Sequence, residues 1–321
     1  MQEYIVLKEE EGQTLEKYIK KKLKSVPLSY IYKLFRKKDI KVNGIRKDMK
    51  SIVHENDQIL VYIPDNKLDS FVNEEKDIFP SIEIEPYIIY EDENILLVNK
   101  PRGMLVQKNE KNVKSLDDLV LSYLLAKGEY DPSNRAFTPG PSHRLDRNTA
   151  GIVIFGKNTL SLHCLMKNMQ DKSKIQKKYL ALVKGVIKRP GEINASLKKD
   201  SINSLVKVTP VEAGGKEAIT LYKPIKVYGD FTLLDVTLLT GRTHQIRVHM
   251  SYINHPIVGD NKYGDFVLNK EMESKYHFTN QFLVAYHLKF GELDFPLSYL
   301  KGKEFEIKIP NDMFQILNNI C

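Results

Sequence analysis

The chain has 321 residues, of which 42% are hydrophobic and 28% charged, and its net charge is +8. This composition is too apolar for a disordered protein, and no apolar run approaches the ~18 residues of a membrane span. The only cysteines, Cys164 and Cys321, exclude a disulfide scaffold and the cysteine pair of a zinc deaminase. Because the N-terminus also lacks a signal peptide pattern, we expect a cytoplasmic protein.

The charge is distributed in blocks along the chain. Residues 14–50 hold 13 basic and 3 acidic side chains, residues 64–93 hold 2 basic and 10 acidic ones, and residues 94–321 hold 33 basic and 22 acidic ones. Two basic blocks joined by an acidic, proline-containing connector predict three parts: a domain over 1–63, a linker over 64–86 and a larger domain over 87–321. A basic balance favours a polyanionic partner.

The first domain is predicted to contain two basic helices and a small sheet. Residues 14–24 have apolar side chains at helical spacing after Thr14, a good N-cap, and Ser29 is expected to cap a second helix. The Asn-Gly pair at 43–44 predicts a hairpin turn, and residues 59–63 read as a closing strand.

From residue 87 on, β-prone runs dominate and predict an α+β domain with a mixed, mostly antiparallel sheet and flanking helices. Ser115 and Asp118 form a capping-box pattern at the start of one helix. The expected strands cover 87–90, 95–98, 151–155, 178–183, 217–227 and 231–239, and the expected helices cover 115–125, 161–169 and 243–250.

Two familiar site patterns can be set aside. GIVIFGKN at 151–158 resembles a phosphate-binding loop, but its four central residues are bulky strand formers and Asn158 replaces the hydroxyl residue that holds magnesium. His244 and His249 are five residues apart, so they do not share a helix face as metal-binding histidines at i, i+4 do. We therefore predict no metal site.

The densest polar cluster is HRLDRNTAG at 143–151. Asp146 lies between Arg144 and Arg147, and nearby positive charge favours the ionised carboxylate. Such a group can act as a nucleophile, a base or an electrostatic partner. From the charges alone, a structural ion pair in this loop explains the pattern equally well.

HRLDRNTAG is similar to the HRLDxxTSG signature of the RluA-type pseudouridine synthases. ILLVNKPRGM (95–104), KKYLALVKG (177–185) and LLTGRTHQIRVHM with HPIVGDNKYG (238–264) match the same family in the same order. SYIYKLFRKKDIKVNG (29–44) resembles an S4 RNA-binding domain, which points to the large-subunit ribosomal RNA members of the C type and then of the D type. Ala150 and Asn148 depart from the usual Ser and Asp.

The resemblance implies that Asp146 is the catalytic aspartate, Tyr179 the active-site tyrosine and Arg247 the basic partner of the aspartate. It implies a cofactor-independent isomerisation of uridine in ribosomal RNA, by a monomer with no protein partner. The residues expected to contact RNA are Arg144, Arg147, Arg242 and His244 in the larger domain and Arg36, Lys37 and Lys38 in the smaller one.

The residues alone leave other readings open. Tyr179 could simply fill the core, Arg247 could be a surface charge on a helix, and the basic run at 36–38 could be a solvated helix face. A non-catalytic RNA-binding protein and another RNA-modifying enzyme, such as a methyltransferase, are the alternative functions. The complete Asp, Tyr and Arg set argues against the first, and the absence of a glycine-rich cofactor loop argues against the second.

Overall fold

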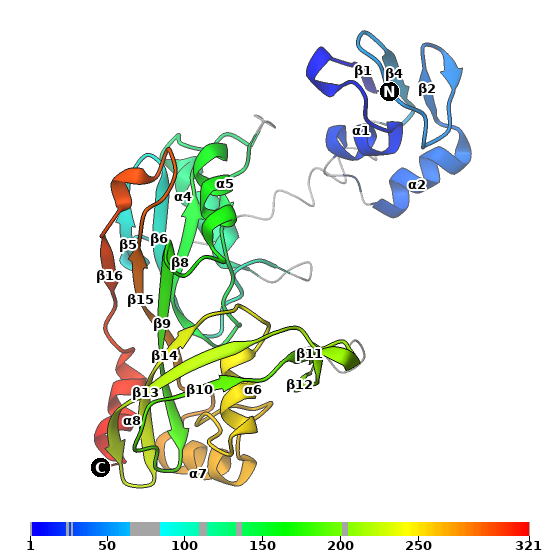
Figure 1. The fold of residues 1–321 in the computed structure, drawn as a ribbon. Coiled ribbons are helices and arrows are strands. Elements are labelled where there is room, and N and C mark those ends of the chain that lie inside the picture. The colour runs from blue at the N-terminus through cyan, green and yellow to red at the C-terminus, as the bar shows by residue number, and fades with distance from the viewer. Residues whose placement is uncertain are drawn as a thin grey trace. The chain divides into compact units, whose positions relative to one another are not determined.

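The computed structural model describes residues 2–23, 26, 28–64, 84–108, 114–132, 137–200 and 205–320. The chain divides into two compact units, Met1–Pro80 and Ser81–Cys321 (Figure 1). The predicted linker over 64–86 lies mostly outside the described residues, so these domain boundaries stay predictions. Within the described ranges, no helix is long and apolar enough to cross a membrane.

The N-terminal unit is a four-stranded antiparallel sheet in the order β1-β4-β2-β3 with two helices. Both residues of the 43–44 turn have positive φ (51° and 74°), as a tight hairpin requires. The second helix begins at Leu28, so Ser29 lies inside it and the predicted cap is wrong. Its elements are β1 (Gln2–Ile5), α1 (Leu15–Lys22), α2 (Leu28–Lys37), β2 (Ile40–Val42), β3 (Ile45–Arg46) and β4 (Gln58–Val61).

The C-terminal unit is built on a ten-stranded sheet whose main path runs β10-β13-β14-β9-β15-β8-β6-β5. Strands β15 and β8 pair in parallel, and the other described pairings in this sheet are antiparallel. This confirms the predicted fold class. The strands are β5 (Ile88–Glu91), β6 (Ile95–Lys100), β7 (Gly140–Pro141), β8 (Ala150–Gly156), β9 (Ile175–Lys184), β10 (Gly191–Asn194), β13 (Ile219–Tyr228), β14 (Phe231–Leu238), β15 (Leu283–Phe290) and β16 (Glu304–Glu306).

Helices cover both faces of the β6–β8 part of the sheet. Alternate residues of each strand enter different cores: Leu96 and Val153 join the core that includes α4, whereas Leu97 and Ile154 join the core that includes α5. All seven residues of β8 are therefore buried, which explains why this strand reads as a continuous apolar run. The helices are α4 (Leu116–Ala126), α5 (Thr159–Asn168), α6 (Gln245–Tyr252), α7 (Phe266–Tyr276) and α8 (Asn311–Asn319).

A short hairpin extends from this unit beside α6 (Figure 1). Its strands, β11 (Leu197–Lys199) and β12 (Val206–Val208), pair with each other and lie off the main sheet. Leu197 and Val206 pack on Val248 of α6 in a small separate core. The hairpin is therefore fixed at its base by apolar contacts with the helix that carries Arg247.

Sheet register brings three distant segments into one row. Tyr179 of β9 is opposite Ala285 of β15, and Ala285 is in turn opposite Gly151 of β8. Gly151 has φ 125°, and any Cβ there would collide with the backbone of Ala285. The glycine thus permits the close approach of β8 and β15. Asp146 lies five residues before Gly151, in the loop that leads into β8.

Candidate active site

The loop that precedes β8 is held in place by a buried lysine. Lys100, at the end of β6, is 0% exposed and donates from Nζ to the carbonyl oxygens of Pro101 (2.9 Å), Met104 (2.8 Å) and Arg147 (3.0 Å). Burial lowers the pKa of Lys100 to about 7, against the opposing effect of Asp146. Because its three hydrogen bonds join the 101–104 segment to Arg147, the residue after Asp146, Lys100 fixes the loop that carries Asp146.

Arg247 joins two carboxylates at the centre of the site. Its Nη1 donates to Asp146 Oδ2 at 2.9 Å, while Nε and Nη2 donate to the two oxygens of Asp260 at 2.7 and 2.8 Å. The side chains of Arg247 and Asp260 are 7% and 1% exposed, whereas that of Asp146 is 24% exposed. Asp260 therefore orients the guanidinium from the interior, and Asp146 meets it at the surface of the pocket.

The charges in this trio support one another. Burial disfavours the charged form of Arg247, but its bonds to Asp260 and then Asp146 outweigh this and raise its pKa. Burial would likewise raise the pKa of Asp260, yet its hydrogen bonds with Arg247 lower it. The site thus holds a permanent cation against the Asp146 carboxylate in surroundings of low polarity, where such a contact is stronger than in water.

Tyr179 borders the same space from β9. It is 6% exposed, and burial, followed by the negative charge of Asp146, raises the pKa of its phenol. The hydroxyl consequently stays protonated at neutral pH. A phenol in this state can stack on a base and donate a hydrogen bond, but it cannot serve as a ready proton acceptor.

His244 and Tyr263 complete the polar surroundings. His244 Nε2 lies 3.9 Å from Asp146 Oδ2, and its Nδ1 lies 2.8 Å from the Tyr263 hydroxyl. That hydroxyl also accepts the backbone N–H of Val206 in β12 at 2.9 Å, and the Tyr263 ring lies under the Arg247 guanidinium at 5.2 Å. Tyr263 therefore connects the β11–β12 hairpin with both basic side chains of the site.

The structure brings the three predicted catalytic residues together: Asp146 bonds to Arg247 and its charge acts on Tyr179. The alternative reading of Arg247 as a surface charge is wrong, because its side chain is 7% exposed. Tyr179 is buried within the large core of this unit, so its reading as a core residue agrees with the structure, and its catalytic role stays a prediction. The sequence prediction assigned no role to Lys100, Asp260 or Tyr263, although all three lie in stretches that match the family. The one feature of the sequence that could have identified them is that each is a polar residue within a motif that matches the family.

The predicted RNA contacts fall into two groups. Arg144, Arg147 and Arg242 are exposed around the Asp146 pocket, and His244 is partly buried beside it. Arg147 Nε donates to Gly103 O at 3.0 Å and Arg242 Nε to Glu217 O at 2.8 Å, which leaves the remainder of each guanidinium outward. Residues 36–38 are exposed at the end of α2 and beyond it, in the N-terminal unit. Contact with RNA stays a prediction for all of them.

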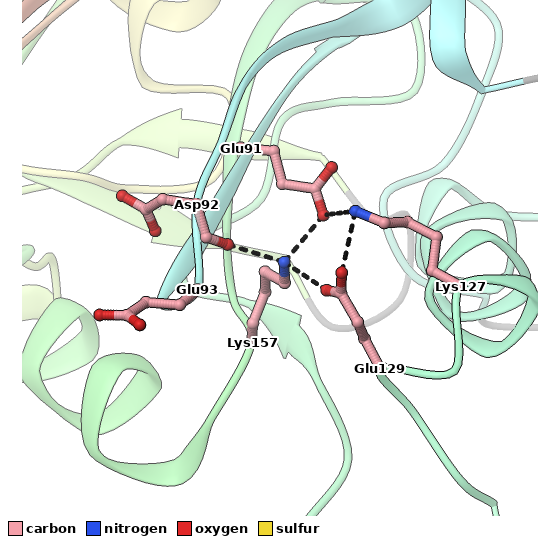
Figure 2. Close-up of a pocket in the computed structure, with 6 residues that line it drawn as sticks. All are labelled: Glu91, Asp92, Glu93, Lys127, Glu129 and Lys157. Atoms are coloured by element: carbon pink, nitrogen blue, oxygen red, sulfur yellow. Dashed lines mark hydrogen bonds and ion pairs between the residues drawn. The ribbon is translucent and has the colours of Figure 1, made fainter.

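A charged pocket of about 560 Å³ is lined by other residues than those around Asp146 (Figure 2). Lys157, just after β8, bonds to Glu91 at 2.8 Å and to Glu129 at 2.5 Å, and Lys127 bonds to both glutamates as well. Burial works against this, yet the bonds from Lys127 and then Lys157 lower the pKa of Glu91 to about 2. The network ties the end of α4 to the sheet, which is a structural role.

The chemistry available around Asp146 is that of a partly exposed carboxyl group beside a cation and a protonated phenol. Among the described residues, no group of three or more His, Cys, Asp or Glu could hold a metal ion. His249, one candidate in the sequence, is buried and bonds to Thr220 Oγ1 at 2.8 Å and Ala195 O at 2.9 Å. It has a structural role in the core.

Comparison with known proteins agrees with this geometry. A family model described as RNA pseudouridylate synthase matches residues 94–252. An RNA pseudouridine synthase of Mycoplasma capricolum is 33% identical over 94% of this chain and 96% of its own length. The chain belongs to the RluA-type RNA pseudouridine synthases. It is therefore an isomerase that acts on RNA.

Further relatives carry more specific names. The ribosomal large subunit pseudouridine synthases C of Vibrio parahaemolyticus and Escherichia coli are 34% and 32% identical over 79% and 88% of this synthase and 77% and 86% of their own lengths. The solved structure of human RNA pseudouridylate synthase domain containing 4 has a TM-score of 0.59 at 20% identity, and the match covers 74% of this chain and 94% of that one. This likeness confirms the fold of the synthase.

Proposed function

We propose that this synthase converts specific uridines of 23S ribosomal RNA to pseudouridine, with Asp146 as the catalytic carboxylate. The observation that carries the assignment of Asp146 is its bond of 2.9 Å to Arg247, a cation that Asp260 holds from the interior. The choice of 23S ribosomal RNA is supported by relatives at 32–34% identity whose names give the large ribosomal subunit.

The reaction breaks the N1–C1′ bond of uridine, turns the uracil and joins C5 to C1′. The proton lost from C5 is balanced by one gained at N1, so no atoms or electrons are exchanged with a cofactor. Asp146 acts on the ribose, either as a nucleophile at C1′ or as a base at C2′, and both routes need the ionised form. Arg247 orients the Asp146 carboxylate through the bond that its Nη1 donates.

Tyr179 borders the uracil while it turns. Its raised pKa favours stacking and hydrogen bonding over a role as the base that removes the C5 proton. The uridine must first leave the RNA stack, which costs a few kcal/mol. Arg144, exposed two residues before Asp146, is placed to enter the space that the base vacates and offset some of this cost.

The smaller N-terminal unit is proposed to be an S4-like RNA-binding domain formed by residues 1–63, joined by the linker 64–86 to the catalytic domain 87–321. Its support is the exposure of Arg36 and Lys37 on α2 and of Lys38 just after it, while Ile31 and Leu34 of the same helix are buried. We further propose that the synthase works as a monomer without a cofactor or protein partner in the cytoplasm.

The test is a map of pseudouridines in 23S ribosomal RNA from cells with and without the gene, followed by complementation. We expect one or a few pseudouridines to disappear in the deletion strain and to return with the wild-type gene but not with Asp146→Asn. The same variant should release no tritium from RNA labelled at C5 of uridine. Restoration by Asp146→Asn, or an unchanged 23S map, would refute the respective part of the proposal.

A further inference from the structure

A group of three basic side chains lies next to the catalytic residues and has no role in the chemistry above. His143 precedes Asp146 by three residues, Lys177 precedes Tyr179 by two on β9, and Lys172 lies in the turn that follows α5. We call His143, Lys172 and Lys177 the basic cluster. The three come together from separate segments at one edge of the active site.

The polar atoms of the basic cluster are poorly satisfied. Lys177 Nζ contacts Met169 Sδ at 3.3 Å, and a thioether is only a weak acceptor. Lys172 Nζ donates to the carbonyl oxygen of the same Met169 at 2.8 Å. Both ring nitrogens of His143 are buried and have no side-chain hydrogen-bond partner within the part of the chain that the structure describes, and the backbone of Arg144 opposes the lowering of the pKa of the ring. Buried polar atoms of this kind ordinarily have partners.

Among the described residues, no carboxylate affects the pKa of Lys177 or of His143. Burial lowers the pKa of Lys177 to about 7, and the charge of Lys172 acts in the same direction. Burial also lowers the pKa of His143, and Lys177 and Lys172 both contribute to that shift. The negative charge of Asp171 opposes the lowering of the pKa of Lys172 in the turn, and it does not contribute to the shifts of Lys177 or His143. The charges of Lys172 and Lys177 therefore oppose each other, and the three groups share no carboxylate among the described residues.

Two other buried cations of this synthase have carboxylate partners, whereas Lys100 bonds to three backbone oxygens. The Arg247 side chain, 7% exposed, has two carboxylate partners, and the Lys157 side chain, also 7% exposed, has Glu91 and Glu129. A buried cation without a counter-charge is costly unless a ligand supplies one. The Lys177 side chain is partly exposed, so this edge of the basic cluster borders solvent.

The position of the cluster indicates which anion this is. Residues two apart in a strand lie on the same face, ~6.6 Å apart along it. Lys177 is thus about one ribose unit away from Tyr179, on the side of the sheet where the uracil would lie. We propose that the basic cluster binds a backbone phosphate of the RNA strand adjacent to the uridine that enters the active site, an inference that rests on the proposed function.

Such a contact fixes the strand and carries no sequence information. The ammonium groups of Lys177 and Lys172 would donate to the phosphate oxygens, and His143 would supply a ring N–H. With the base out of its stack, a phosphate held beside the pocket keeps C1′ in reach of Asp146. The expected effect of losing the contact is weaker binding of RNA rather than altered choice of base.

The experiment compares Lys177→Gln with Lys178→Gln as a matched control. Lys178 is the neighbouring residue on the opposite face of β9, and its Nζ lies 3.4 Å from Asp235 Oδ2, so the two variants remove the same charge at adjacent positions. Binding is measured as Kd for an oligonucleotide that contains the target uridine, and for oligonucleotides with one methylphosphonate on either side of it.

We expect Lys177→Gln to weaken binding about tenfold or more on native RNA, since a charge-assisted hydrogen bond is lost. One of the two methylphosphonate RNAs should bind the wild type more weakly than native RNA does, by a similar factor. The same RNA should bind Lys177→Gln no more weakly than native RNA does. For Lys178→Gln, the loss of affinity from the substitution and the loss from the methylphosphonate should multiply independently. His143→Gln, measured in the same way, provides a second variant if Lys177→Gln does not fold.

The proposal is overturned if the losses from Lys177→Gln and from each methylphosphonate multiply independently. It is also overturned if inorganic phosphate binds the wild type and not Lys177→Gln while every methylphosphonate is without effect, because the cluster would then take free phosphate. Since Kd is independent of turnover, a failure of the proposed 23S assignment would appear separately, as absence of pseudouridine formation by the wild type.

Discussion

The two carboxylates that share Arg247 should give opposite phenotypes when each is changed to its amide. Asp260, with a side chain 1% exposed, accepts two bonds from Arg247 and the backbone N–H groups of Lys262 and Tyr263. In Asp260→Asn an NH2 group must face one of these donors. Removing one partner of a buried pair costs ~3–5 kcal/mol, and because Arg247 keeps Asp146 we expect about 3 kcal/mol.

Asp146→Asn should leave the free energy of unfolding within about 1 kcal/mol of the wild type. Its carboxylate is 24% exposed and has one bond to Arg247, which retains both bonds to Asp260. Activity should nevertheless be lost, because the amide cannot supply the charge or the nucleophile. The assays are denaturant unfolding followed by circular dichroism and tritium release from RNA labelled at C5 of uridine.

Acid pH provides an independent check. Burial would raise the pKa of Asp260, but Arg247 lowers it below its usual 3.8. A lowered pKa in the folded state means that the ionised form stabilises the fold at pH above 3.8 and that this contribution is lost as pH falls through the folded value. The wild type should therefore lose stability more steeply below about pH 4 than Asp260→Asn does.

The reasoning is refuted if Asp146→Asn destabilises the fold as much as Asp260→Asn, or if Asp260→Asn stays within about 1 kcal/mol of the wild type. Either result would mean that Asp260 is not the interior anchor of Arg247. An equal slope of stability against pH in both proteins would contradict the assigned charge state of Asp260.

Three further changes have defined outcomes. Gly151→Ala should abolish soluble expression, measured against the wild type, because the new Cβ collides with the backbone of β15. Tyr263→Phe removes the hydroxyl that bonds to His244 Nδ1, so ¹⁵N NMR of labelled histidine should show an altered tautomer balance for His244; an unchanged spectrum would exclude this positioning role. Replacing Lys37 and Lys38 together by Ala should reduce the salt slope of RNA binding by ~0.7–0.9 per lost phosphate contact, with single-turnover rate at saturating RNA unchanged.

The contact between Asp146 and Arg247 could be predicted from motifs but not from local physics. Asp146 and Arg247 are 101 residues apart, and only the sheet order β14-β9-β15-β8 brings their segments together. Residue type and spacing alone left Arg247 a candidate surface charge. Its function depends on Asp260, whose own signal was no more than an acidic residue in a matched stretch.

Elements with strong local patterns were predicted well, and those without them were missed. The capping box of Ser115 and Asp118 begins α4 as predicted, and the Asn-Gly turn joins β2 and β3. Helix α7 was missed because it has no apolar stripe: Met272 is its one buried residue, and Phe266 and Val267 are 60% and 80% exposed. The run LVAYHLKF of β15 is β-prone and could have been predicted, although its parallel pairing with β8 could not.

The two carboxylate contacts of Arg247 differ in burial and in the number of hydrogen bonds. The Asp260 end of Arg247 is buried and fully bonded, so the cost of placing a cation in the interior is met before RNA arrives. The Asp146 end has a single bond and partial exposure, which leaves carboxylate oxygen available to the ribose. One cation anchored from the interior thus contacts the Asp146 carboxylate without relying on that carboxylate for the fold.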